Sequence, residues 1–251
     1  AALTSDQIVS LSTSQVRSMS SYNVVALTTA QLVAMETADI AALTTDQLAN
    51  LTTAQTAALT TAQIIALGTD GIVALETTDI AALTTAQVVS LTTAQVKALS
   101  STQLNSLDSD QLGAMETADL AALTTAQIAK LSTAQVALLS TDQVVALTTA
   151  QVASLTSPQA GALTTDQIVE LGTAQIAALT TAQASALTSD QVSELGTDQV
   201  AALGSAQLAK LSTAAVAALS TDQIVALKTA QVAAMSSAQA AALTTEQVES
   251  L

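Results

Sequence analysis

The sequence is short of the residues on which most enzyme chemistry depends. Its 251 residues include no cysteine, no histidine, no phenylalanine and no tryptophan, and one tyrosine, Tyr22. Without cysteine there is no disulfide framework and no thiol nucleophile. Without histidine, the usual zinc sites and the Ser-His-Asp triad cannot be assembled. We therefore expect a protein that is not an enzyme.

Positive charge is equally scarce. Five Lys and Arg stand against twenty Asp and Glu, which gives a formal net charge of −15 at pH 7. Proteins that bind nucleic acid neutralise its phosphates with Lys and Arg, so this balance argues against nucleic acid as a partner, and against an anionic membrane surface. No stretch of 18 apolar residues occurs either, so insertion into a membrane is not expected.

What the sequence does contain is a strict eight-residue repeat. From Leu3 to Leu251, every eighth residue is Leu or Met, and all four Met fall on this phase. The repeat runs through thirty-one octads without an insertion or deletion. We number the positions of each octad 1 to 8, with this Leu or Met as position 1. A fixed short period is typical of a solenoid whose units contact only their neighbours, so we expect a single uninterrupted array over residues 1–251.

Two architectures other than short helices fit this period less well. In one continuous α-helix, eight residues overshoot two turns by about 80°, so the Leu stripe would wander round the helix and bury no face. A β-solenoid suits the even period and the Thr, Val and Ile content. However, position 1 and the apolar position 6 would point to opposite faces of a strand. The β-solenoid is kept as the alternative fold.

Each octad carries the signals that begin a helix. Thr or Ser at position 2 with Gln at position 5 matches the capping box, and Leu at position 1 with Ile, Val or Leu at position 6 matches the hydrophobic staple. Seventeen of the twenty acidic residues lie at positions 2 to 5, and four of the five basic residues lie at positions 7 or 8, as a helix dipole favours. So short a helix is unstable alone and must stack on others. The sequence predicts an all-α solenoid with one very short helix in each octad.

The first residue of each helix has two interpretations. Position 3 is Thr or Ser in every octad, whereas position 2 also takes Gly, Asp, Glu or Lys. Yet wherever Glu occupies position 2, position 5 changes from Gln to Asp, which indicates that these two positions touch. We favour position 2 as the cap, with the position 3 hydroxyl bonding a neighbouring repeat.

The octads with Glu at position 2 also supply the candidate metal ligands. Their Glu and Asp are three residues apart, on one face of a helix, and the pairs recur every forty residues. Calcium takes six to eight oxygen ligands, so these pairs would have to stack or face each other in space. The alternative is a duplicated cap variant on a solvated surface. The candidate calcium ligands are Glu36, Asp39, Glu76, Asp79, Glu116 and Asp119.

Two other polar positions recur through the array. Gln at position 5 is interpreted as structural, through capping or through hydrogen bonds between repeats. The Thr residues at positions 2 and 3 could form a regular hydroxyl lattice, and such a lattice resembles the surfaces of ice-binding proteins. An ice-binding array is therefore one alternative for the function.

Two families resemble parts of this sequence. The segment from Leu139 to Leu147, LSTDQVVAL, resembles the first helix of a TAL-effector repeat. The chain has no counterpart of that family's second helix, base-reading loop or 34-residue period, so DNA binding is not implied. Over all its octads, the chain is similar to the Ala/Thr-rich short-repeat arrays of very large secreted or surface proteins of Gram-negative bacteria.

The second resemblance implies an adhesin-like protein at the cell surface or outside the cell. In such a protein the array is expected to be a structural spacer, stalk or fibre segment, and self-association into fibres or surface layers is expected with it. A protein- or glycan-binding solenoid is the alternative. Because the sequence opens in mid-octad, we expect a processed product or a segment of a longer array.

Overall fold

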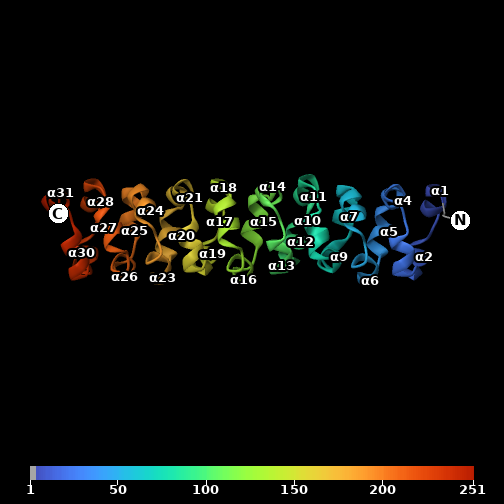
Figure 1. The fold of residues 1–251 in the computed structure, drawn as a ribbon, viewed down its shortest axis with the longest axis horizontal. Coiled ribbons are helices and arrows are strands. Elements are labelled where there is room, and N and C mark those ends of the chain that lie inside the picture. The colour runs from blue at the N-terminus through green and yellow to red at the C-terminus, as the bar shows by residue number, and fades with distance from the viewer. Residues whose placement is uncertain (1–3) are drawn as a thin grey trace. The chain divides into compact units, whose positions relative to one another are not determined.

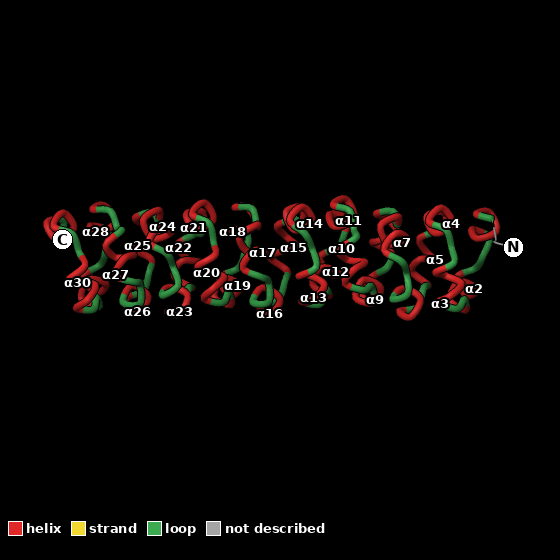
Figure 2. Tube along the Cα trace, viewed as in Figure 1, coloured by secondary structure: helices red, strands yellow, loops and turns green. Residues whose placement is uncertain are grey.

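The computed structural model describes residues 4–251, and Leu3, the first leucine of the array, lies outside them. Each octad forms one α-helix of four to seven residues, and these described residues contain no strand (Figures 1 and 2). The predicted all-α solenoid is confirmed, and the β-solenoid alternative is wrong. The physical reason is that a capping box recurs every eight residues and starts a helix in each octad, which leaves no stretch long enough for a strand.

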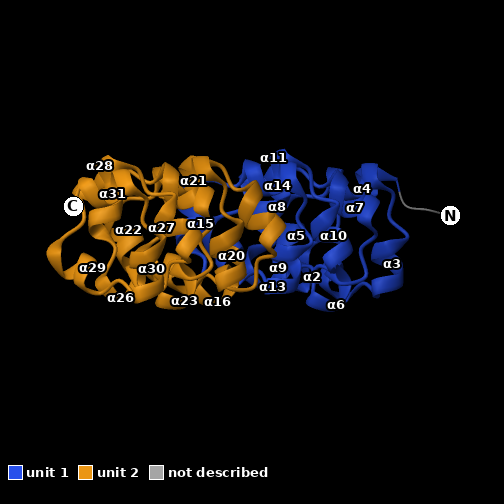
Figure 3. Cartoon of the chain, turned by 60° about the vertical axis from the view of Figure 1, so that its left-hand side comes forward, with its two compact units in different colours: residues 1–123 blue, residues 124–251 orange. Residues whose placement is uncertain are grey.

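The chain divides into two compact units, residues 1–123 and 124–251 (Figure 3). The helices of the first unit are α1 (Ser5–Val9), α2 (Thr13–Ser18), α3 (Ser21–Val25), α4 (Thr29–Ala34), α5 (Thr37–Ala42), α6 (Thr45–Leu48), α7 (Thr53–Ala58), α8 (Thr61–Ala66), α9 (Gly68–Ala74), α10 (Thr77–Ala81), α11 (Thr85–Ser90), α12 (Thr93–Ala98), α13 (Ser101–Asn105), α14 (Ser109–Ala114) and α15 (Thr117–Ala122).

The second unit continues the same octads. Its helices are α16 (Thr125–Ile128), α17 (Thr133–Leu138), α18 (Thr141–Val145), α19 (Thr149–Ser154), α20 (Ser157–Ala162), α21 (Thr165–Glu170), α22 (Thr173–Ala178), α23 (Thr181–Ala184), α24 (Ser189–Glu194), α25 (Thr197–Ala202), α26 (Ser205–Leu208), α27 (Thr213–Ala217), α28 (Thr221–Val225), α29 (Thr229–Ala233), α30 (Ser237–Ala242) and α31 (Thr245–Glu249).

The capping box at positions 2 and 5 sets the start of the helices. Before α11, Thr84 Oγ1 accepts a hydrogen bond from the Gln87 amide at 3.2 Å, and Gln87 Oε1 accepts one from the Thr84 amide at 2.7 Å. The same reciprocal pair opens helices in both units. Position 2 is thus the cap, as favoured above. The helix stops when Leu91, position 1 of the next octad, turns to φ −59° and ψ 135°.

Positions 1 and 6 form the core of each unit. Ile64, Ile72 and Ile80 at position 6 are fully buried, and Leu75 and Leu83 at position 1 are each 3 % exposed. Burying one such pair in each octad contributes about 3–6 kcal/mol. This burial compensates for the weak helical preference of so few residues, and it confirms the staple predicted from the sequence.

Within each unit, the helices pack mainly on the helix three octads further along rather than on the next helix. In the first unit α2 packs on α5 and α5 on α8, and in the second α19 packs on α22 and α22 on α25. A residue therefore meets its tertiary neighbours about 24 residues away.

The Gln at position 5 makes a second connection, to the octad four positions earlier. Gln167 is 2 % exposed, and its Oε1 accepts a hydrogen bond from the Thr164 amide at 2.8 Å. Its Nε2 donates to three carbonyl oxygens at the C-terminal end of α17, those of Val136 at 3.0 Å, Ala137 at 3.3 Å and Leu139 at 2.6 Å. One carboxamide thus caps the start of its own helix and the end of another, which confirms the structural interpretation of this Gln.

This connection recurs in both units. In the first unit it is made by Gln47, Gln55, Gln63, Gln87, Gln95, Gln103 and Gln111. In the second it is made by glutamines from Gln159 to Gln247. Because helices pack on the third octad and bond to the fourth, each turn of either solenoid takes between three and four octads.

One octad departs from the pattern. Leu67 keeps helical angles, φ −57° and ψ −26°, and Gly68 follows at φ +64°, so α8 passes almost directly into α9 and the two helices contact each other. Gly68 is the residue with a positive φ among those described. In the same octad Gly71 stands at position 5, where the connecting Gln is expected.

We expect Gly68→Ala to lower the free energy of unfolding by about 1–2 kcal/mol, because a Cβ disfavours the left-handed backbone. An added Cβ at Gly68 would meet no atom within 4 Å, so the cost is conformational. Gly172→Ala is the matched control, because Gly172 has φ −65° and an added Cβ would lie 3.5 Å from Gln175 Oε1. Urea unfolding followed by circular dichroism measures both. Equal effects of the two substitutions would contradict the prediction.

We expect Gln167→Glu to lower the free energy of unfolding by about 2–4 kcal/mol, because a buried carboxylate has no hydrogen to donate and faces three carbonyl oxygens. The control is Gln7→Glu. Gln7 is exposed, and its Oε1 accepts the Thr4 amide at 2.9 Å, a role that a Glu carboxylate also performs. The same denaturation assay compares them, and a Gln167→Glu variant as stable as the control would show that the connection is energetically minor.

Candidate functional site

The Glu and Asp pairs open three helices of the first unit. Glu36, Glu76 and Glu116 are the exposed caps of α5, α10 and α15. The third residues of these helices, Asp39, Asp79 and Asp119, are buried, with 4 %, 1 % and 3 % of their surfaces exposed. The Asp79 Oδ2 accepts a hydrogen bond from the Glu76 amide at 3.3 Å, so positions 2 and 5 touch in this octad as the linked substitution predicted.

The pairs remain apart from one another. They recur every five octads, whereas helices meet at intervals of three octads and side chains bond at intervals of four. Residues 4–251 contain no group of three or more Asp or Glu that could hold a metal ion. Calcium binding at Glu36, Asp39 and their repeats therefore stays a prediction, with two carboxylates available at each place. The aspartates also differ from a solvated cap variant, because they are buried.

Each of these aspartates occupies the place of the connecting Gln. The corresponding acceptors for Asp79 are the carbonyl oxygens of Leu48 and Leu51, thirty-one and twenty-eight residues earlier, and an ionised carboxylate has no hydrogen to offer them. Burial raises the pKa of all three carboxyls, and the charge of the neighbouring Glu raises it further. The Glu76 amide lowers the pKa of Asp79 in part, and a hydrogen bond with Thr93 lowers that of Asp119.

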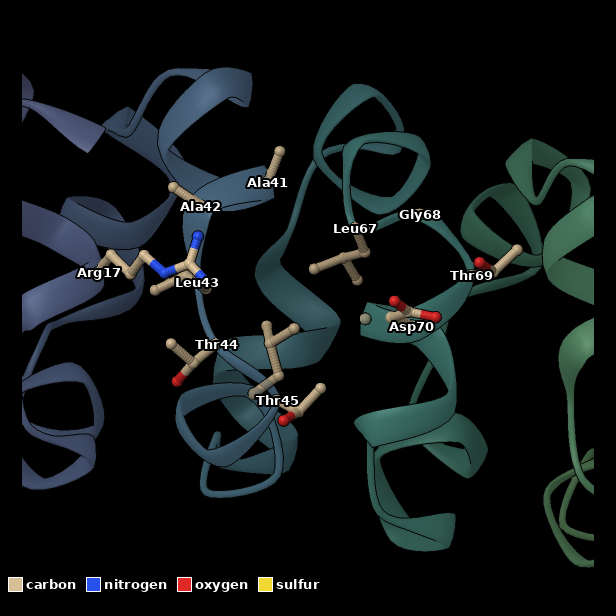
Figure 4. Close-up of a pocket in the computed structure, with 12 residues that line it drawn as sticks. Arg17, Ala41, Ala42, Leu43, Thr44, Thr45, Leu67, Gly68, Thr69 and Asp70 are labelled. Carbon is tan, nitrogen blue, oxygen red and sulfur yellow. The ribbon is translucent and has the colours of Figure 1, made fainter. Parts of the chain in front are cut away.

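A second polar site, which the sequence pattern does not predict, lies beside α9. A cavity of about 460 Å³ is lined by the C-terminal end of α5, the first residues of α6, the Leu67–Gly71 turn and the side chain of Arg17 from α2 (Figure 4). All of its lining residues belong to the first unit. The signal that could have revealed it is Gly71, which leaves an octad without its connecting Gln.

Serine, threonine and lysine side chains are the remaining reactive groups. The Thr and Ser at position 2 are engaged as caps through both units, so their hydroxyls accept hydrogen bonds from helix amides. The position 3 residues lie mostly exposed, and the hydrogen bond of Thr93 to Asp119 is one case in which position 3 bonds a neighbouring repeat, as predicted. That the chain is not an enzyme stays an expectation from its composition.

We expect Asp79→Asn to raise the free energy of unfolding at pH 7 by about 1 kcal/mol, because the amide carries no charge and can donate hydrogen bonds. The pKa of Asp79 is raised in the folded state, so its contribution to stability is present below the unfolded pKa of about 3.9 and is lost as pH rises through the folded value. The advantage of the variant should therefore vanish at about pH 3.

The control is Asp142→Asn. Asp142 is exposed in the first turn of α18, where its negative charge favours the helix dipole, so this substitution should give no gain at pH 7. Thermal or urea unfolding between pH 3 and pH 8 measures both variants. An Asp79→Asn effect that does not change with pH would contradict the assignment of a buried, costly carboxylate.

None of the helices described between residues 4 and 251 is long and apolar enough to cross a membrane. No curated protein matches the sequence. The sequence model of the ALTTAQ repeat matches the chain eight times, at residues 1–35, 32–69, 72–109, 112–149, 145–173, 169–197, 192–229 and 216–251. These matches take in nearly the whole chain and confirm the internal repeat found from its period. The chain therefore belongs to the ALTTAQ repeat family.

Proposed function

We propose that this chain is a structural repeat scaffold, a spacer, stalk or fibre segment of an adhesin-like protein at a bacterial cell surface. The observation that carries the proposal is the glutamine connection. It recurs through both units and commits the most frequent buried polar side chain to holding octads together. A chain whose polar groups are used this way is suited to keeping a shape rather than to turning over a substrate.

The composition of the exposed positions supports the same proposal. The outward residues are mainly Thr, Ser and Ala with acidic residues among them, and the net charge is −15. Such a surface is soluble and repels other acidic surfaces. Packing and hydrogen bonds between octads also resist extension. Pulling one octad away requires breaking its contacts with octads three and four positions removed.

We test the proposal in two ways. Antibodies against the chain should label intact cells of its source, and external protease should remove the label; a signal found only after permeabilisation would refute the surface location. Single molecules pulled from both ends should resist extension and lengthen in many small, equal steps. A Gln167→Glu chain should yield at lower force than the Gln7→Glu control, and a chain that extends without measurable resistance would refute the spacer role.

Self-association is tested separately from the spacer role. Fibres or surface layers predict assembly that depends on protein concentration, seen by analytical ultracentrifugation and electron microscopy. A chain that stays monomeric at about millimolar concentration would refute fibre formation by self-association, because weak protein contacts have dissociation constants in that range.

A further inference from the structure

The cavity beside α9 lies at the octad in which Gly71 replaces the connecting glutamine. In the regular octads position 5 lies opposite the carbonyl oxygens thirty-one, thirty and twenty-eight residues earlier, as Gln63 and Gln103 show. For Gly71 these residues are Ile40, Ala41 and Leu43. Gly71 has no side chain to reach them, and a Cβ there would lie 3.0 Å from Leu67 Cβ and 3.2 Å from Leu48 Cδ1. Ala41, Leu43 and Gly71 all line the cavity.

The walls of the cavity supply charges of both signs. Arg17, one of five basic residues in the chain, extends from α2 and lines the cavity (Figure 4). Asp70 lies on the opposite side, in the first turn of α9. Both residues are exposed at the mouth, whereas the apolar side is closed by the buried Leu48 and Leu67. The volume of about 460 Å³ falls within the range of small-molecule pockets.

We propose that this cavity binds a glutamine group, as the free amino acid or as the C-terminal residue of a peptide. The carboxamide of the ligand donates to the carbonyl oxygens of Ala41 and Leu43, as the chain's own glutamines do in other turns. The ligand's carboxylate pairs with Arg17, whose planar guanidinium favours two parallel hydrogen bonds. The N–H of its α-nitrogen donates to Asp70.

Selectivity follows from the carbonyl oxygens. Glutamate has the size of glutamine but would bring a second carboxylate, which has no hydrogen for these acceptors and is repelled by their partial negative charge. Among the chain's own octads, Asp39 and Asp79 illustrate the cost of a carboxylate in this place, since burial raises the pKa of both. The cavity should therefore accept the amide and reject the acid.

The experiment is a titration of the whole ¹⁵N-labelled chain with L-glutamine, followed by NMR. The chain has seven glycines, whose amide signals are easily separated, and two of them line the cavity. We expect Gly68 and Gly71 to shift with a dissociation constant of about 0.1–10 mM, as suits a ligand of this size, and the remote Gly196 and Gly204 to stay in place. L-Glutamate should bind at least about ten-fold more weakly.

Arg17→Ala should weaken glutamine binding by about 10- to 100-fold, since one charge-assisted contact is lost. Lys210→Ala, which removes an exposed charge from α26's octad, should leave the affinity unchanged. Arg17 is exposed, so its removal is not expected to unfold the chain, and circular dichroism checks this.

The peptide Ala-Ala-Gln distinguishes the two sources of the ligand. Binding as tight as that of L-glutamine or tighter identifies a peptide end, and binding of the free amino acid alone identifies a metabolite; both support the proposal. It is overturned if Gly68 and Gly71 do not shift with either compound, if L-glutamate binds as well as L-glutamine, or if Arg17→Ala binds as tightly as the unaltered chain.

Discussion

The structure depends on a primary carboxamide that accepts at one end and donates at the other. A helix leaves four amides at its start and four carbonyls at its end without partners, so a helix of six residues consists almost entirely of ends. The Gln at position 5 serves both kinds of end at once: Gln167 accepts the Thr164 amide and donates to the last carbonyls of α17. Hydrophobic burial brings the helices together, and this side chain makes their ends compatible with a dry interior.

The chemistry of that position explains why replacements are few. A carboxylate can accept a hydrogen bond at the start of its own helix, as Asp79 does from the Glu76 amide. It has no hydrogen to donate to the end of another helix. Burial and the charge of the neighbouring Glu raise the pKa of Asp39, Asp79 and Asp119. Gly71, which also replaces the Gln, lines a cavity. At these four positions the exceptions to the repeat add features other than shape, whereas Ala215, which also replaces a Gln, is packed in the core.

Local structure could be predicted from the sequence because its causes lie within eight residues. Residue types at fixed spacing predicted both the capping box of Thr84 and Gln87 and the burial of Leu83. The partners of Gln167 could not be predicted, because they depend on the number of octads in a turn, and no local pattern states that number. For the same reason the sequence could not tell whether the pairs at Glu36 and Glu76, forty residues apart, meet in space; contacts fall at other intervals.

The regular register has a consequence for how such chains change in length. Most octads are interchangeable, so gaining or losing one leaves each glutamine opposite an equivalent helix end, and unequal recombination between copies would be structurally silent. The cavity beside α9 has no such tolerance. It requires Arg17 in the second octad, the end of α5 in the fifth and Gly71 in the ninth. Deleting the sixth, seventh or eighth octad would move the glycine opposite a different helix end. We therefore expect natural variants to keep the number of octads in this stretch constant.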